Sequence, residues 1–188
     1  LAVRTLWHNN EQRAIGVADI SVTMFDDDVY IEPDLPDYRE LTPEEEAAFA
    51  DFRIGLQQGY RQIVPDPQVE ALLQGYSEGQ FASLNYDRAG DAEIHFNNVT
   101  LFIQAYLNPD SSYYLDEDLA DHIAAGFDFW ISNDYQDSNW WHNVIGFQRR
   151  MTRPAILFAD VLQADYPDVY EDVVGYFRRV YEYMIVDP

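Results

Sequence analysis

Residues 116–133 read DEDLADHIAAGFDFWISN, and this stretch has the pattern of a helix with one buried face. Asp116 is a residue type that caps helix N-termini well, because its side-chain oxygen can accept a backbone N–H of the first turn. Apolar side chains then recur at every third or fourth position, at Leu119, Ile123, Phe127, Trp130 and Ile131. A face this wide needs a partner, so the stretch predicts a helix packed against other elements.

The same periodicity recurs on both sides of this stretch. It predicts five further helices, over about 42–64, 65–76, 92–107, 147–164 and 168–185. Thr42 and Glu45 have the spacing of a capping box, Tyr76 falls on the apolar face of its helix, and Pro154 is expected to kink or restart the helix that contains it. Short turns between wide apolar faces favour antiparallel helical hairpins, so the predicted fold is all-α.

Residues 1–40 differ from the rest of the chain. Apolar residues partly alternate with polar or small ones over residues 15–24, and another apolar run, residues 29–31, follows a turn of three aspartates. This pattern favours a short β-hairpin or an extended arm. Residues 32–37 contain two prolines and are typical of a stiff linker. We therefore expect an arm and linker over residues 1–40 and one helical domain over residues 41–188.

The composition narrows the class of protein. The 188 residues include 34 acidic and 11 basic ones, giving a formal net charge of −23, and every basic residue is arginine. A field of that sign repels phosphate, which argues against a nucleic-acid partner. Cysteine is absent, which excludes disulfides and thiolate metal sites, and no apolar run reaches the roughly 20 residues that cross a bilayer. We expect a globular domain with no cofactor, no bound metal and no membrane contact.

Residues 138–150, SNWWHNVIGFQRR, bring aromatic, amide and cationic groups together. Consecutive residues of a helix point about 100° apart, so Trp140 and Trp141 cannot both face one core, and at least one indole should project into a loop or cleft. The flat face of an indole can stack on the C–H groups of a sugar ring. Neighbouring polar side chains could bond sugar hydroxyl or carboxylate oxygens: Asn139, His142 and Asn143.

Three arginines follow close behind, Arg149, Arg150 and Arg153. In so acidic a chain, clustered guanidinium groups favour an anionic ligand held by bidentate hydrogen bonds. Two alternatives stay open for this stretch. A tryptophan pair often belongs to the core at the end of an element, and clustered arginines often pair with surface carboxylates.

Asn139-Trp140-Trp141, followed by Ile145-Gly146, basic residues and a long helix, closely resembles the Asn-Trp-Trp and Ile-Gly-x-Pro-Arg stretch of polysaccharide lyase family 8, the hyaluronate, chondroitin and xanthan lyases. Upstream segments are similar to this family as well: Phe81–Tyr86, Ala105–Tyr106, Asn108–Tyr114 and Gly126–Trp130. The resemblance covers about residues 45–188. One departure is that Phe147-Gln148 stands where the family has a proline after Ile-Gly.

The resemblance implies both a fold and a reaction. The catalytic domain of the family is an (α/α) toroid, and this chain would form its N-terminal part, an incomplete ring of hairpins. Lyases of this kind cleave a uronic-acid glycoside by β-elimination: the sugar carboxylate is neutralised, the C5 proton is removed and the leaving oxygen is protonated. In the family an Asn, a His, a Tyr and an Arg perform these steps, downstream of the Asn-Trp-Trp stretch and past the last residue of this sequence. We therefore expect no catalytic residue in this chain.

The binding residues can be carried over more directly. The resemblance assigns an aromatic patch that orients the polysaccharide to Asn139, Trp140 and Trp141. Further side chains are expected to line the same cleft: Asn85, Tyr86, His142, Asn143, Arg149 and Arg150. The expected partner is an anionic, uronic-acid-containing polysaccharide, and the remainder of the catalytic domain is a second one. The resemblance also implies a secreted or periplasmic protein.

Two other functions fit the same residues. A non-catalytic carbohydrate-binding domain needs only the tryptophan pair. An α/α glycoside hydrolase would need two carboxylates about 5 to 9.5 Å apart across a cleft, such as Asp128 with Asp134 or Asp137. A lyase leaves an unsaturated product and a hydrolase leaves a new reducing end without one, so the product separates these classes.

Overall fold

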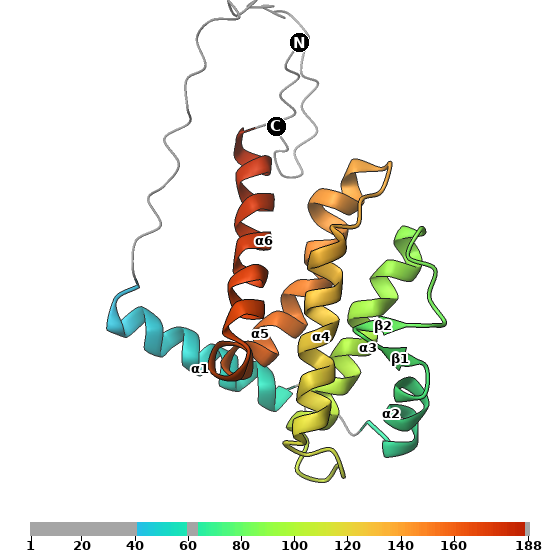
Figure 1. The fold of residues 1–188 in the computed structure, drawn as a ribbon. Helices are drawn as coiled ribbons and strands as arrows, with labels where there is room; N and C mark the ends of the chain where they lie inside the picture. The colour runs from blue at the N-terminus through green and yellow to red at the C-terminus, as the bar shows by residue number, and fades with distance from the viewer. Residues whose placement is uncertain (1–40, 60–63, 187–188) are drawn as a thin grey trace, which may run out of the picture. The chain divides into compact units, whose positions relative to one another are not determined.

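The computed structural model describes residues 41–59 and 64–186, and every element below belongs to one compact unit, Asp37–Pro188 (Figure 1). Its α-helices are α1 (Pro43–Gly59), α2 (Asp66–Leu73), α3 (Ala89–Leu107), α4 (Glu117–Asn133), α5 (Phe147–Asp165) and α6 (Pro167–Val186). A π-helical turn, η1 (His142–Gly146), and a hairpin of strands β1 (Tyr76–Ser77) and β2 (Gln80–Phe81) complete the described elements. The all-α prediction is confirmed, whereas the predicted arm and linker, residues 1–40, lie outside the described residues.

Helices α1 and α4 begin where the sequence places capping side chains. At the start of α1 the Thr42 backbone N–H donates to Glu45 Oε2 (2.9 Å) and the Glu45 N–H donates to Thr42 Oγ1 (3.3 Å), which is the predicted capping box. At the start of α4 the Leu119 N–H donates to Asp116 Oδ1 at 2.8 Å. Helix α4 ends at Asp134, whose φ of 43° is in the left-handed region. These contacts confirm the predicted starts of both helices and the predicted end of α4, whereas residues 60–63 of the first predicted helix lie outside the described residues.

The long helices pack as antiparallel neighbours around one core. Helix α3 packs on α4 and α5, α6 packs on α4 and α5, and Figure 1 shows that α3 and α4, like α5 and α6, run in opposite directions. The largest fully buried side chains come from all of these helices except α6: Phe96, Phe102, Phe127, Trp130, Phe147 and Phe158. The predicted hairpins are therefore present, and closure into an (α/α) toroid stays a prediction. None of the described helices has the length and apolar composition that crossing a membrane requires.

Helix α1 lies at the edge of this assembly. None of its described residues is buried, and its polar contacts reach α5: Gln57 Nε2 donates to the Leu157 carbonyl (3.0 Å), and Arg53 Nη2 lies 2.6 Å from Asp160 Oδ1. At α5 one helix continues through Pro154 without a restart, and a kink at this residue stays a prediction. A single lost backbone hydrogen bond is tolerated here, where Pro154 is buried among core residues.

The placement of Tyr76 on a helix was wrong. Helix α2 ends at Leu73, and Tyr76 instead pairs with Phe81 in the β1–β2 hairpin. The turn of the hairpin contains Gly79 with φ +81°, where a Cβ atom would lie 2.2 Å from the Ala125 carbonyl oxygen of α4. Only glycine fits so close to the helix, so the hairpin lies directly on α4.

A buried hydrogen-bond chain joins this hairpin to α3 and α4. The Phe81 backbone N–H donates to the Tyr86 hydroxyl oxygen (3.1 Å), which lies 3.0 Å from Nδ1 of the fully buried His95. His95 Nε2 lies 3.0 Å from the Gly126 carbonyl, which can only accept, so Nε2 carries the proton and Nδ1 accepts from Tyr86. Burial lowers the pKa of His95 to about 4, and the Gly126 bond opposes the shift. His95 is thus a neutral packing residue.

Candidate functional site

The segment that carries the tryptophan pair is anchored by its own polar side chains. Asn139 Oδ1 accepts the backbone N–H of Trp141 (3.1 Å), so Asn139 caps the helical run that continues through η1 into α5. The Asn139 N–H donates in turn to Asp137 Oδ1 at 2.7 Å. Asn143 clamps the same loop, because its Oδ1 accepts the Asp137 N–H (2.7 Å) and its Nδ2 donates to the Asp137 carbonyl (2.8 Å). Both asparagines therefore fix the loop between α4 and η1.

The two indoles separate as the helical geometry predicts. Trp140 is 63% exposed, whereas Trp141 is half-buried and meets the His142 ring edge to face, with centroids 5.2 Å apart. The Trp141 ring also covers Gly146, where an added Cβ atom would lie 2.9 Å from Trp141 Cζ3. The prediction that at least one indole projects out of the core is confirmed for Trp140.

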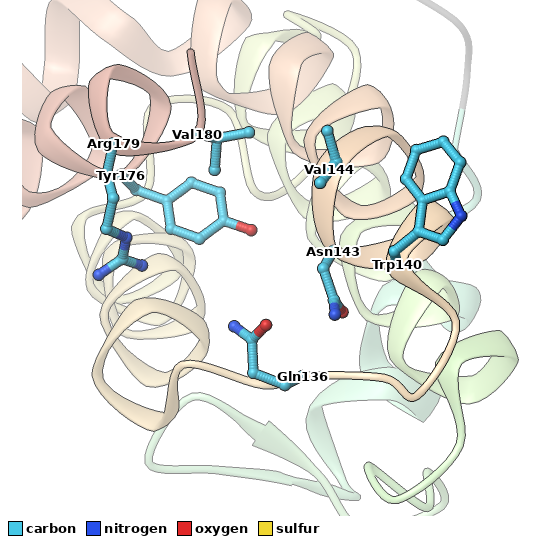
Figure 2. A pocket seen from close by; sticks show the side chains of 7 residues that line it. All are labelled: Gln136, Trp140, Asn143, Val144, Tyr176, Arg179 and Val180. Carbon is cyan, nitrogen blue, oxygen red and sulfur yellow. The ribbon is translucent and has the colours of Figure 1, made fainter. Parts of the chain in front are cut away.

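A pocket of about 260 Å³ opens beside Trp140 (Figure 2). It is lined by the loop after α4, the first helical turns that follow, and one face of α6, through Gln136, Trp140, Asn143, Val144, Tyr176, Arg179 and Val180. Of the described residues that line it, none is acidic and Arg179 alone is cationic, although the chain has 34 acidic residues. The described lining residues thus include a cation and no acid, although the chain as a whole is strongly negative.

The α6 wall of the pocket is held by contacts to neighbouring elements. Arg179 Nη2 lies 2.8 Å from Asp134 Oδ1 at the end of α4, and its guanidinium lies 5.4 Å from the centre of the Tyr176 ring. The buried Tyr176 hydroxyl accepts a hydrogen bond from Gln148 Nε2 at 3.3 Å. Burial raises the pKa of Tyr176, the contacts with Trp130 and Arg179 oppose this shift and the charge of Asp134 adds to it, so the hydroxyl stays protonated at neutral pH.

The predicted cationic residues of α5 do not line this pocket. Arg149 is exposed on α5, and Arg150 Nη2 lies 3.3 Å from Glu93 Oε2 of α3. His142 turns toward the same carboxylate, with Nδ1 3.4 Å from Glu93 Oε1. The structure therefore brings His142 and Arg150 together at Glu93, and their binding roles stay predictions.

Asn85 and Tyr86 also lie outside the lining of the pocket. The Tyr86 ring stacks on Tyr135, with centroids 5.3 Å apart and planes 23° apart, while its hydroxyl belongs to the His95 chain. Asn85 Oδ1 accepts the Asp87 N–H at 3.1 Å, which is a local turn contact. Because Tyr135 belongs to the loop between α4 and η1, the Tyr86 ring packs against this loop and supports it.

The carboxylates considered for hydrolysis are each engaged locally. Asp128 accepts from the Ser132 hydroxyl (3.1 Å), Asp134 pairs with Arg179, and Asp137 accepts the Asn139 N–H. None of these three described residues lines the pocket. Within residues 41–59 and 64–186, no three His, Asp or Glu side chains are grouped as metal ligands would be.

Sequence reasoning missed five residues that line the pocket: Gln136, Val144, Tyr176, Arg179 and Val180. The last three lie at positions i, i+3 and i+4 of α6, so they share one face of that helix. An arginine between Tyr176 and Val180 is the signal that could have marked this face. Which loop lies opposite this face depends on the tertiary fold, so the partner residues could not be predicted from the pattern.

Comparison with known proteins places these helices in a family. The family model described as polysaccharide lyase family 8, N terminal alpha-helical domain, matches residues 57–181. Chondroitinase-AC of Pedobacter heparinus is 36% identical over 63 residues, a match that covers 34% of this chain and 9% of that enzyme. The matched part is therefore a small fraction of the relative's length. Because the family match spans α2 to α6 and the loop that carries the tryptophan pair, the chain belongs to polysaccharide lyase family 8.

Proposed function

We propose that this domain binds an acidic, uronic-acid-containing polysaccharide and is the substrate-binding part of a polysaccharide lyase. The observation that carries the proposal is the exposed Trp140 at the edge of a pocket that has a cationic and no acidic lining residue. The name of the relative, chondroitinase, supports a substrate of this chemical class.

Trp140 is suited to stack on a sugar ring. Its indole is 63% exposed, so a sugar can cover it and remove apolar surface from water. The pocket that Trp140 borders also offers the Gln136 amide and, on its α6 wall, the guanidinium of Arg179 (Figure 2). An apolar platform with a few convergent polar groups is the usual form of a small-ligand site.

We assign the residues of this chain to binding and orientation rather than to proton transfer. β-Elimination needs a group that neutralises the uronate carboxylate, a base for the C5 proton and an acid for the leaving oxygen. The pocket supplies a positive charge and hydrogen-bond donors, and its Tyr176 hydroxyl is held protonated by burial. In our proposal the polysaccharide is held here while other residues of the lyase carry out the proton transfers.

Replacing Trp140 tests the binding proposal. Trp140→Ala should weaken the binding of a chondroitin hexasaccharide by about 1 to 2 kcal/mol, which is roughly 5- to 30-fold in Kd, because the stacking platform is lost. The exposed indole contributes little to packing, so the melting temperature should stay nearly unchanged. Isothermal titration calorimetry and thermal unfolding measure the two quantities.

Two control variants make the result specific. Phe49→Ala removes an aromatic residue of similar exposure, 58%, from α1, and should leave Kd unchanged. Trp141→Ala should lower the melting temperature, because the Trp141 ring packs on Gly146 and His142. A hexasaccharide Kd that is equal for Trp140→Ala and Phe49→Ala would disprove the binding role of Trp140.

A product assay separates the lyase reading from its alternatives. With chondroitin as substrate, the domain alone should bind without producing the ultraviolet absorbance of an unsaturated uronate. Absorbance produced by this chain would overturn the assignment of proton transfer to other residues. New reducing ends without that absorbance would indicate a hydrolase instead.

A further inference from the structure

We propose that Tyr176 and Arg179 form a subsite for the acidic group of one sugar unit, beside the unit that stacks on Trp140. The inference rests on the proposed function, because it assumes that a polysaccharide enters this pocket. It goes further by assigning recognition of the acidic group to α6, which the sequence pattern assigns to core packing. The two residues lie one helical turn apart on the same wall of the pocket (Figure 2).

The Tyr176 hydroxyl is positioned to donate its proton into the pocket. Gln148 Nε2 contacts the Asn143 carbonyl, which can only accept, so the orientation of the Gln148 amide is fixed with nitrogen on that side. The same nitrogen donates to the Tyr176 oxygen at 3.3 Å. In this contact the hydroxyl oxygen is the acceptor, which leaves its proton to point at a ligand oxygen. Figure 2 shows the hydroxyl directed toward the Asn143 and Val144 side of the pocket.

Arg179 provides the positive charge of the subsite. One nitrogen, Nη2, is engaged by Asp134 at 2.8 Å, and the Tyr176 ring lies against the guanidinium. A guanidinium has five N–H donors in a rigid fork, so donors remain for a ligand oxygen while the Asp134 contact holds the group in place. The side chain is 58% exposed, which keeps it accessible from solvent.

The charge of the surroundings favours an acidic group at this position. The described lining residues contain Arg179 and no carboxylate, and the neutral Gln136 amide donates to Asp134 Oδ1 (3.4 Å), the same oxygen that pairs with Arg179. The nearest acidic contact is Asp134, which is already paired with Arg179 and does not line the pocket. A carboxylate and a sulfate both present oxygens that accept from such donors, so either group of an acidic sugar fits this chemistry.

Three hexasaccharides distinguish the possible sources of the acidic group: unsulfated chondroitin, its carboxyl-reduced form and chondroitin 4-sulfate. Arg179→Gln and Tyr176→Phe should each raise the Kd of the unsulfated hexasaccharide, by about tenfold for the arginine, since a charge-assisted hydrogen bond is lost. Neither variant should weaken the binding of the carboxyl-reduced form further, because the group that they recognise is absent. A loss confined to chondroitin 4-sulfate would identify sulfate as the recognised group.

Matched variants control for charge and folding. Arg178→Gln makes the same change of charge one residue away on α6, outside the pocket lining, and should leave every Kd unchanged. Tyr176→Phe keeps the buried ring and deletes only the hydroxyl. If Arg179→Gln does not fold, Arg179→Lys keeps the charge without the planar fork and should still weaken binding of the acidic hexasaccharides.

The outcomes distinguish this inference from the proposed function. If Arg179→Gln or Tyr176→Phe weakens the carboxyl-reduced hexasaccharide as much as the acidic ones, or if Arg179→Gln behaves like Arg178→Gln, the subsite is refuted while Trp140-dependent binding stands. If the unmodified chain binds none of the three hexasaccharides, the proposed function and the subsite are both refuted.

Discussion

Gly146 shows how a single residue determines the position of the tryptophan pair. Its backbone has φ −63°, which any residue adopts, so the reason for glycine is space rather than conformation. A Cβ atom would lie 2.9 Å from Trp141 Cζ3 and 3.1 Å from His142 Nδ1. A methyl group here must displace the Trp141 ring, which lies next to the loop that presents Trp140.

We predict that Gly146→Ala lowers the free energy of unfolding by about 1 to 2 kcal/mol, because the overpacking strain exceeds the gain in helix propensity. Urea denaturation monitored by circular dichroism measures the change. The matched control is Gly175→Ala in α6, where an added Cβ meets nothing within 4 Å. That variant should stabilise the protein by about 0.5 to 1 kcal/mol, and equal effects of the two substitutions would refute the steric argument.

Other residues show how far a binding site can be predicted from sequence alone. Asn139 and Asn143 were singled out correctly as neighbours of the exposed indole, yet their side chains bond the backbone of their own loop. An asparagine that caps a helix and one that binds a sugar are the same residue type, so only geometry separates the two roles. Arg150 pairs with Glu93 because α3 packs on α5, and its predicted role in ligand binding stays a prediction.

At the scale of elements, the helices could be predicted because their causes are local. Apolar periodicity and capping residues lie within each segment, as the Thr42 and Asp116 contacts illustrate. The π-turn η1 could not be predicted this way. The π-turn inserts one residue into the helical run. The Gln148 side-chain amide donates to the Asn143 carbonyl within this turn, and Phe147-Gln148 stands where the resemblance places a proline. The hairpin was missed because its strands have two residues each and depend on packing against α4.

The buried His95 chain makes the packing of the hairpin, α3 and α4 dependent on pH. The folded-state pKa of His95 is about 4 and the unfolded-state value is about 6.5, so between these values the unfolded chain binds more protons. The stability contributed by neutral His95 is therefore complete above about pH 6.5 and is lost as the pH falls toward 4, by up to about 3 kcal/mol.

Comparison of the parent protein with His95→Gln between pH 7 and 4.5 tests this linkage. Glutamine can still donate to the Gly126 carbonyl but does not titrate, so the variant should lose less stability over this range than the parent. Urea denaturation at each pH gives the two slopes. Many carboxylates also titrate near the acidic end, and the difference between the two proteins removes their shared contribution. Parallel slopes would show that His95 is not the titrating group.

For the whole molecule, the net charge and the proposed ligand have the same sign. A formal charge of −23 repels an acidic polysaccharide at long range, while Arg179 attracts it only at short range. Salt screens the distant charges first, since the Debye length falls from about 30 Å at 0.01 M to about 10 Å at 0.1 M. Added salt should therefore speed the association of the ligand but weaken its retention in the pocket.

We predict that the association rate constant for a chondroitin hexasaccharide rises between 0.01 and 0.1 M salt, because the long-range repulsion is screened. The dissociation rate constant should rise as well, because the contact with Arg179 weakens. Stopped-flow measurement of tryptophan fluorescence gives both constants, with Trp140 as a reporter at the pocket edge. The carboxyl-reduced hexasaccharide should show little salt dependence. An association rate that falls with salt would mean that the local charge of the pocket outweighs the charge of the whole chain during approach.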